Sequence, residues 1–118
     1  MSLRCLIVDD HQGFLHAARV LLESGGISVV GAASTSAEAI ELAVGTRPDI
    51  VLVDIMLGPE SGFDLARQLA ADPRLTGMRV VLISTHAEED FADLLAVSPA
   101  VAFLPKWKLS AAAVRDVL

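Results

Sequence analysis

The chain has 118 residues, a formal net charge of −6 and a hydrophobic share of 53%. This length fits one domain with its own core, which we expect to span residues 1–118, and the apolar content excludes a disordered chain. No apolar run reaches the roughly 18 residues that cross a bilayer, and the opening residues lack a signal-peptide pattern, so we expect a soluble cytoplasmic protein without a membrane partner. An acidic surface repels phosphates, so we expect no direct nucleic-acid binding by this domain.

Five short apolar runs alternate with helix-like stretches along the chain. The runs are continuously apolar and rich in Val and Ile, which is typical of strands buried on both faces of a parallel sheet. They cover residues 5–8, 27–33, 50–53, 80–83 and 101–104. Between the last two runs, residues 91–95 have the apolar spacing of a helix.

Helix signals fill the other intervals as well. Phe14, Ala18 and Leu22 recur four residues apart on one helical face, and two consecutive glycines then end that helix. Residues that commonly cap helix starts precede three later helices: Thr35 (which forms a capping box with Glu38), Ser61 and Ser110. Five successive β–α units predict an α/β fold with helices on both faces of a parallel sheet.

Polar side chains follow four of the five predicted strands. Asp9 and Asp10 follow the first strand, Asp54 the third, Ser84 the fourth and Lys106 the fifth. Function in open parallel sheets collects beyond the carboxyl ends of the strands. The sequence therefore predicts that three carboxylates, a hydroxyl group and an ammonium group meet at one edge of the sheet.

This set of groups suits phosphoryl transfer. Crowded carboxylates repel one another, and their pKa values rise unless a cation lies between them. Mg²⁺ favours one or two carboxylates together with phosphate oxygens and water. One carboxylate can then attack a phosphoryl group while Lys106 neutralises charge on the transferred oxygens.

Each of these residues also has an ordinary interpretation when it is taken alone. Asp9 and Asp10 are suitable caps for the first helix, Asp54 suits a solvated loop, and Lys106 suits an exposed surface. Convergence of all of them at one edge of the sheet favours a common site over three separate explanations.

The remaining metal-binding and thiol residues carry weaker signals. His11, His16 and His86 lack Cys or Glu partners at the spacings of zinc sites, so no transition-metal site is expected. Cys5 is the single cysteine, which excludes an internal disulfide, and its place in the first apolar run predicts a small buried hydrophobic residue.

Four segments resemble the receiver domains of two-component response regulators. They are LIVDDH at residues 6–11, PDIVLVDI at 48–55, VVLIS at 80–84 and AFLPK at 102–106. The resemblance covers nearly the whole chain and is closest to receivers that precede a helix-turn-helix of the LuxR/NarL type. It implies a flavodoxin-like, doubly wound, five-stranded parallel sheet of order 2-1-3-4-5 with five helices.

The resemblance also implies a role for each residue of the acidic edge. Asp54 would accept a phosphoryl group from a partner sensor histidine kinase or a small phosphodonor. Mg²⁺ would be held by Asp9, Asp10, Asp54 and the backbone carbonyl of Met56. Lys106 would pair with a phosphoryl oxygen. The domain would catalyse only its own phosphorylation and dephosphorylation and would not otherwise be an enzyme.

Further residues are implied to switch or tune the domain. Ser84 would turn toward the phosphoryl group and draw Phe103 inward. Met56 and His86 would flank the entrance and tune the access of water, the alternative being that they are ordinary loop residues. Gly58 departs from the family pattern, which often has proline at this place.

Phosphorylation would then change a surface made by the fourth helix, fifth strand and fifth helix. Family members often form homodimers or contact their outputs through this surface. A DNA-binding output domain following residue 118 is expected from the same resemblance.

Two other functions compete with a phosphorylated receiver. A pseudo-receiver would have the same fold and would bind proteins without being phosphorylated, but the complete set of acids disfavours it. A flavin-binding or phosphatase enzyme is disfavoured because no glycine-rich or hydroxyl-rich phosphate loop follows the first strand, and the chain contains no Asp-x-Asp motif.

Overall fold

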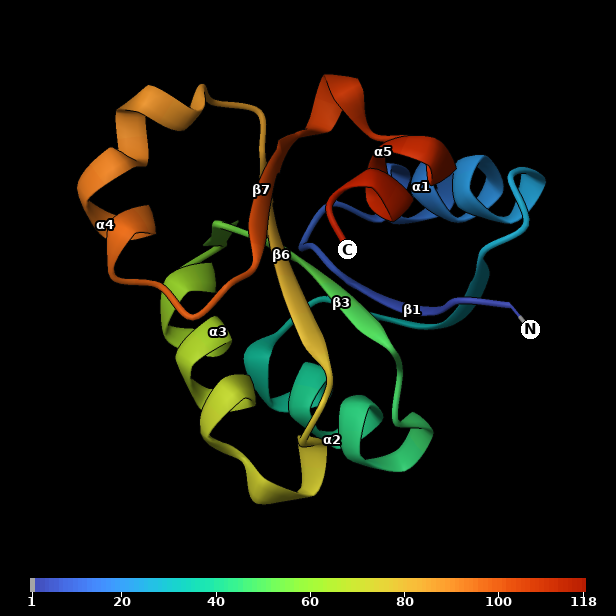
Figure 1. The fold of residues 1–118 in the computed structure, drawn as a ribbon, viewed down its shortest axis with the longest axis horizontal. Coiled ribbons are helices and arrows are strands. Elements are labelled where there is room, and N and C mark those ends of the chain that lie inside the picture. The colour runs from blue at the N-terminus through green and yellow to red at the C-terminus, as the bar shows by residue number, and fades with distance from the viewer. Residues whose placement is uncertain (1) are drawn as a thin grey trace.

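The computed structural model describes residues 2–118, in which a parallel sheet lies between two layers of helices (Figure 1). The strands of this sheet are β1 (Arg4–Val8), β2 (Ser28–Ala33), β3 (Ile50–Asp54), β6 (Arg79–Ser84) and β7 (Ala102–Pro105). Their order is β2-β1-β3-β6-β7, and all neighbours are parallel. Counted over this sheet alone, the order is the predicted 2-1-3-4-5, so the predicted fold is confirmed.

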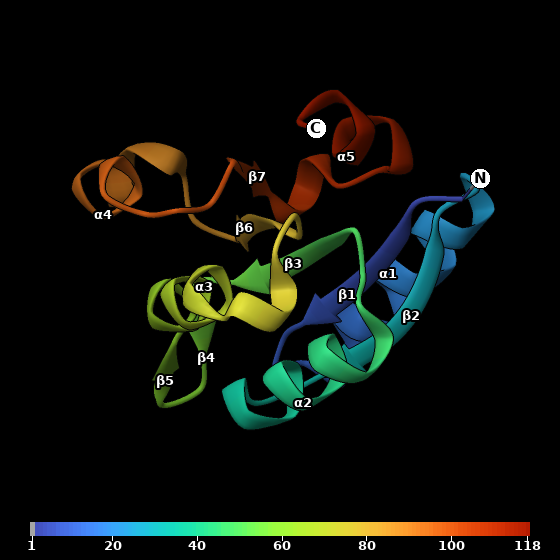
Figure 2. The same ribbon diagram turned by 60° about the horizontal axis from the view of Figure 1, so that its bottom comes forward.

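Helices cover both faces of the sheet. Within the described residues they are α1 (Gln12–Ser24), α2 (Ser36–Thr46), α3 (Gly62–Ala71), α4 (Ala92–Ala96) and α5 (Ala111–Asp116). Helices α1 and α5 lie on one face and α2 and α3 on the other, while α4 lies beside the edge strand β7 (Figure 2). None of the helices in the described part of the chain has the length and apolarity to cross a membrane.

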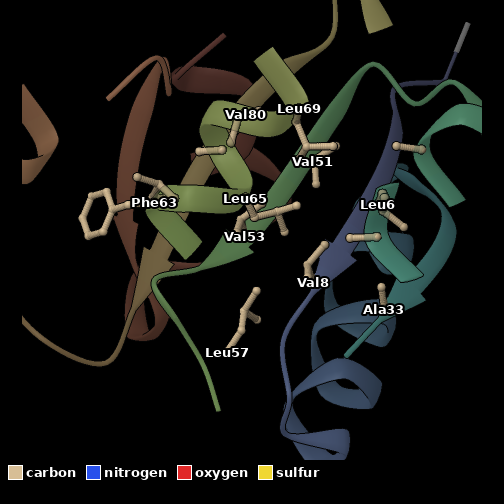
Figure 3. Packing of buried hydrophobic residues seen from close by; sticks show 14 of the residues in the cluster. Leu6, Val8, Ala33, Val51, Val53, Leu57, Phe63, Leu65, Leu69 and Val80 are labelled. Atoms are coloured by element: carbon tan, nitrogen blue, oxygen red, sulfur yellow. The ribbon is translucent and has the colours of Figure 1, made fainter. Parts of the chain in front are cut away.

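Side chains of successive residues in the strands alternate between the two faces. Leu6 and Val8 of β1 pack with α2 and α3, whereas the intervening Ile7 packs with α1 and α5. Figure 3 shows Leu65 and Leu69 of α3 meeting the β3 side chains on the first of these faces. Because both faces are covered, the central strands are apolar except at their end residues, which is why they are recognisable as continuous runs.

Most of the helix caps that the sequence predicted are present in the structure. The Thr35 hydroxyl accepts a hydrogen bond from the Glu38 backbone N–H at 3.2 Å, and the Glu38 carboxylate in turn accepts one from the backbone N–H of Ser34 rather than Thr35. The hydroxyl groups of Ser61 and Ser110 cap α3 and α5 in the same way. These polar side chains satisfy backbone donors that the first turn leaves without a partner.

The two aspartates after β1 do not cap α1. Its N-cap residue is His11, and within residues 2–118 no side chain makes a capping hydrogen bond to this helix. Asp9 instead accepts the backbone N–H of His11, which lies before the first helical residue. The carboxylates of Asp9 and Asp10 are therefore available to the edge of the sheet.

Two local features were not predicted. A short hairpin of β4 (Met56–Leu57) and β5 (Glu60–Ser61) follows β3, and Gly58 makes its turn at φ 59°, a conformation that glycine adopts without strain. The predicted helix at 91–95 begins as a 3₁₀ turn, η2 (Glu88–Phe91), and none of the residues of α4 in the described chain is fully buried. Helix α4 has the five residues that the spacing indicated, but it begins one residue later.

Burial makes the Cys5 thiol a test of how rigidly the central strands are held. Cys5 is fully buried, and this burial raises the pKa of its thiol to about 12 despite a hydrogen bond from the backbone of Leu52. Only the thiolate reacts, so we expect the folded protein to react with iodoacetamide at pH 8 at least ~100-fold more slowly than the denatured chain. Mass spectrometry of timed samples measures both rates, with Cys5→Ala as the blank. Similar rates in the folded and denatured protein would contradict the burial of β1.

Candidate functional site

A cleft of about 290 Å³ opens at the carboxyl edge of the parallel sheet. Its wall includes Asp54 at the end of β3, Ser84 at the end of β6, Lys106 after β7, and Asp10 after β1. Asp9 is completely buried and lies against the same lysine. The fold therefore brings together the polar residues that the sequence placed after four different strands.

The acids of this edge are close enough to act on one ion. Asp9, Asp10, His11 and Asp54 each offer one ligand atom, and these atoms lie within 4.8 Å of one another. Asp54 is 4% exposed, whereas the Asp10 side chain is 31% exposed. The site thus has buried acids at its base and an accessible acid at its mouth.

Lys106 links two of the three carboxylates. Its Nζ lies 2.6 Å from Asp9 Oδ2 and donates a hydrogen bond of 3.1 Å to Asp54 Oδ2. The same ammonium group lies 4.3 Å from the centre of the Phe14 ring, a cation–π contact that stabilises its positive charge. Burial opposes the charge on this lysine, but the contacts with Asp9 and Asp54 outweigh it, so the pKa of Lys106 is raised.

The Asp54 carboxyl group lies in an environment that disfavours its charge. Burial is the largest effect and raises the pKa of Asp54, and the neighbouring negative charge of Asp9 raises it further. A hydrogen bond of 3.2 Å from the Met56 backbone N–H and the contact with Lys106 oppose this increase without cancelling it. A further cation beside Asp54 would favour the charged carboxylate that a nucleophile requires.

The donor set fits a hard divalent cation. Three carboxylates share one ammonium group, which leaves excess negative charge in a largely buried place. In addition, Asp9 Oδ2 accepts no well-aligned hydrogen bond from any group in residues 2–118, and its close contact with Lys106 is an ion pair. Oxygen ligands of this kind are those that Mg²⁺ takes in proteins.

The hydroxyl group and the entrance residues lie where the sequence placed them. Ser84 is buried, and its Oγ accepts a hydrogen bond of 2.9 Å from the His86 backbone N–H. Met56 and His86 both line the cleft and are exposed, Met56 at 54%. Phe103 does not line the cleft. It is half-buried on β7 and packs against the core on the α3 side, together with Phe91.

Three residues of the site were missed by sequence reasoning. His11 directly follows the acidic pair, but its contact with both acids depends on the turn into α1. Phe14 was identified only as part of a helical apolar face, although its ring also contacts Lys106. Gly62 gave no signal, yet a side chain there would overlap the backbone at the end of β3.

Comparison with known proteins identifies the family. The family description "Response regulator receiver domain" matches residues 5–113. The chain belongs to the response regulator receiver family. It is accordingly a receiver domain of a signalling protein rather than a classical enzyme, and the family predicted from the sequence is confirmed.

Relatives of this receiver include several kinds of response regulator. It is 33% identical over 86 residues to Protein PilH of Pseudomonas aeruginosa, covering 73% of this chain and 70% of PilH. It is 34% identical over 85 residues to the phosphate regulon transcriptional regulatory protein PhoB of the same organism, covering 72% of this chain but only 37% of PhoB. The receiver thus spans less than half of such longer regulators.

Solved receivers have the same fold. The signal receiver domain of the response regulator NarL from Mycobacterium tuberculosis is 31% identical, with a TM-score of 0.81 over 98% of this chain and 94% of that one. The receiver is thus similar to a receiver of the NarL type, as the sequence resemblance implied.

Gly62 provides a test of how closely α3 supports the site. A Cβ atom at Gly62 would lie 2.8 Å from the carbonyl carbon of Asp54 and overlap its oxygen, so α3 or the end of β3 must move. We expect Gly62→Ala to lower the free energy of unfolding by about 1–3 kcal/mol, as overpacking of a core does. Urea denaturation followed by circular dichroism measures this change.

The matched control for this substitution is Gly45→Ala in α2. A Cβ atom at Gly45 meets nothing within 4 Å in the described chain, so this variant should be as stable as the wild type or gain about 0.5–1 kcal/mol. Equal stabilities of Gly62→Ala and the wild type would contradict the close packing of α3 beneath Asp54.

Proposed function

We propose that this receiver accepts a phosphoryl group on Asp54 and thereby switches an output. The single observation that carries the proposal is the cluster of Asp9, Asp10 and Asp54 at one edge of the sheet, in which Lys106 contacts both Asp9 and Asp54. The donor is a phosphohistidine on a partner sensor histidine kinase or a small phosphodonor. In the transfer, an oxygen of Asp54 forms the new bond to phosphorus as the bond to the leaving nitrogen or oxygen breaks, and the leaving group takes the electron pair.

Mg²⁺ is the cofactor that this proposal assigns to the site. Asp9, Asp10, Asp54 and the backbone carbonyl of Met56 would hold it, and its charge would neutralise the transferred oxygens. Lys106 already contacts Asp54 Oδ2 and can follow a phosphoryl oxygen without leaving Asp9. The raised pKa of Lys106 keeps its ammonium group charged for this purpose.

The conformational change would extend from the Ser84 hydroxyl group to the edge strand β7. Ser84 presently fixes the loop after β6 by accepting the His86 backbone N–H. A phosphoryl group on Asp54 would attract the Ser84 hydroxyl proton, and the loop and the half-buried Phe103 would move with it.

An apolar surface beside Phe103 supports a partner there. Leu94, Val97, Val101 and Trp107 are exposed on or next to α4, β7 and the turn η3 (Lys106–Lys108), with Trp107 at 77%. Exposed apolar residues gathered in this way commonly mark interaction surfaces. We assign to this surface a homodimer or an output contact. A DNA-binding domain after residue 118 would be the output, which is consistent with PhoB being a transcriptional regulatory protein.

Phosphorylation of Asp54 is tested by intact mass. Incubation with acetyl phosphate and Mg²⁺ should add the mass of one phosphoryl group to the wild type, and Asp54→Asn should add none. Asp93→Asn, which removes an exposed acid of α4, is the matched control and should be phosphorylated like the wild type. A folded wild type that gains no mass would instead favour the pseudo-receiver.

The entrance residues are tested by the lifetime of the phosphoryl group. Met56→Asn replaces an apolar side chain at the cleft with one that binds water, and His86→Ala widens the mouth. Since water access limits hydrolysis, we expect both changes to accelerate dephosphorylation, on the order of threefold or more. Val97→Asn, at an exposed apolar position outside the cleft, is the control. Rates equal to the wild-type rate in both variants would show that Met56 and His86 are ordinary loop residues.

A further inference from the structure

The ring of Phe14 lies against the ammonium group of the site. Lys106 Nζ lies over this ring, 4.3 Å from its centroid, which is well inside the roughly 6 Å limit of a cation–π contact. Phe14 is the third residue of α1, which begins two residues after Asp10, so the turn that follows the acids also brings the ring to the site. The lysine comes from the other end of the chain, after β7. The contact therefore joins two segments that meet only in the folded protein.

The burial of Lys106 makes this contact stronger than one at the surface. The side chain of Lys106 is 12% exposed, and its Nζ lies 2.6 Å from Asp9 Oδ2 and 3.1 Å from Asp54 Oδ2. Cation–π contacts strengthen when water is excluded from them. Trp107 provides a comparison within the same chain, because Lys108 Nζ lies 5.0 Å from its ring centre while the residue is 77% exposed. Water weakens that second contact, whereas it has little access to the first.

A neutral ring suits this position better than a charged group. A further carboxylate beside Lys106 would also attract the ammonium group, but it would add negative charge to a site that already has three acids. A phosphodonor is itself negatively charged and would be repelled by that charge. The quadrupole of an aromatic ring attracts an ammonium group without carrying a net charge. The ring also exerts the same attraction whether the lysine pairs with Asp54 or with a phosphoryl oxygen.

An ordinary core role accounts for only part of what Phe14 does. The residue is half-buried and packs against the apolar layer between the sheet and the helices α1 and α5. A leucine would be apolar and large enough for that packing, but it has no aromatic face to offer a cation. The aromatic character of Phe14 therefore matters to Lys106 in a way that burial alone does not require.

We propose that Phe14 is a positioning residue for phosphoryl transfer, and that its ring holds the Lys106 ammonium group beside Asp54. The inference rests on the proposed phosphorylation of Asp54 and adds to it a residue outside the acidic cluster. An ammonium group that is fixed before the reaction stabilises the charge on the transferred oxygens without having to reorganise at that moment. Loss of the aromatic face lets the ammonium group move and slows the transfer.

Fluorinated phenylalanines incorporated at Phe14 alone test the ring directly. Successive fluorine atoms withdraw negative charge from the face of the ring and leave its shape nearly unchanged. Phosphorylation by acetyl phosphate with Mg²⁺, followed by intact mass, should become slower with each added fluorine, reaching about fivefold for the trifluoro ring. Phe14→Leu should be slowed at least as much. Urea denaturation should give the same free energy of unfolding for the wild type and the fluorinated proteins.

Lys106→Gln supplies the matched control, because it removes the positive charge and keeps Phe14. In this background the fluorinated rings and Phe14→Leu should all react at the rate of Lys106→Gln alone. Such non-additivity is what a double-mutant cycle gives when one residue acts through the other.

The outcomes separate this inference from the proposed function. Phosphorylation of the wild type at a rate that fluorination of Phe14 leaves unchanged would overturn the inference and leave the proposed function standing. An equal loss of rate with and without the charge of Lys106 would show that Phe14 acts only by packing, and would also overturn the inference. A folded wild type that gains no phosphoryl group would overturn both.

Discussion

The contact of Lys106 with Asp9 and Asp54 is the interaction on which the site depends. It holds two carboxylates close together in a place with little water, where their mutual repulsion is strong. One ammonium group cannot balance three acids, so the site retains a negative charge that attracts further positive charge. Burial is the largest cause of the raised pKa of Asp54, and the negative charge of Asp9 adds to it.

The excess of negative charge at the site follows from the way in which the fold buries its strands. The strands β1, β3 and β6 are apolar except at their ends, because helices cover both faces. Polar residues can appear only where the strands end, and parallel strands end at the same edge. Gly62 then lets α3 begin directly beneath Asp54, which fixes the acid against the cleft.

The difference between patterns that are local in sequence and contacts that form only in the folded chain explains what the sequence could and could not predict. The strands, the three serine and threonine helix caps and the grouping of Asp9, Asp10, Asp54, Ser84 and Lys106 at one edge follow from runs of residues that are local in sequence, whereas the strand order was implied by the resemblance to receiver domains. The β4–β5 hairpin and the short α4 depend on how neighbouring elements pack. The roles of His11, Phe14 and Gly62 were missed because each rests on a contact through space that no local pattern records. The chemical roles of the acids stay predictions.

The weakest element of the fold lies next to the part that would move. Helix α4 contributes only partly buried or exposed side chains in the described chain, so its local stability is low compared with that of α2 or α3. The His86 backbone N–H ties the start of the loop before α4 to Ser84, and Phe91 and Phe103 both pack against the core on the α3 side. The proposed change of charge at Asp54 would therefore act on an element that needs little free energy to rearrange. A site built on the rigid central strands can in this way change an exposed surface at the edge of the sheet without disturbing its own geometry.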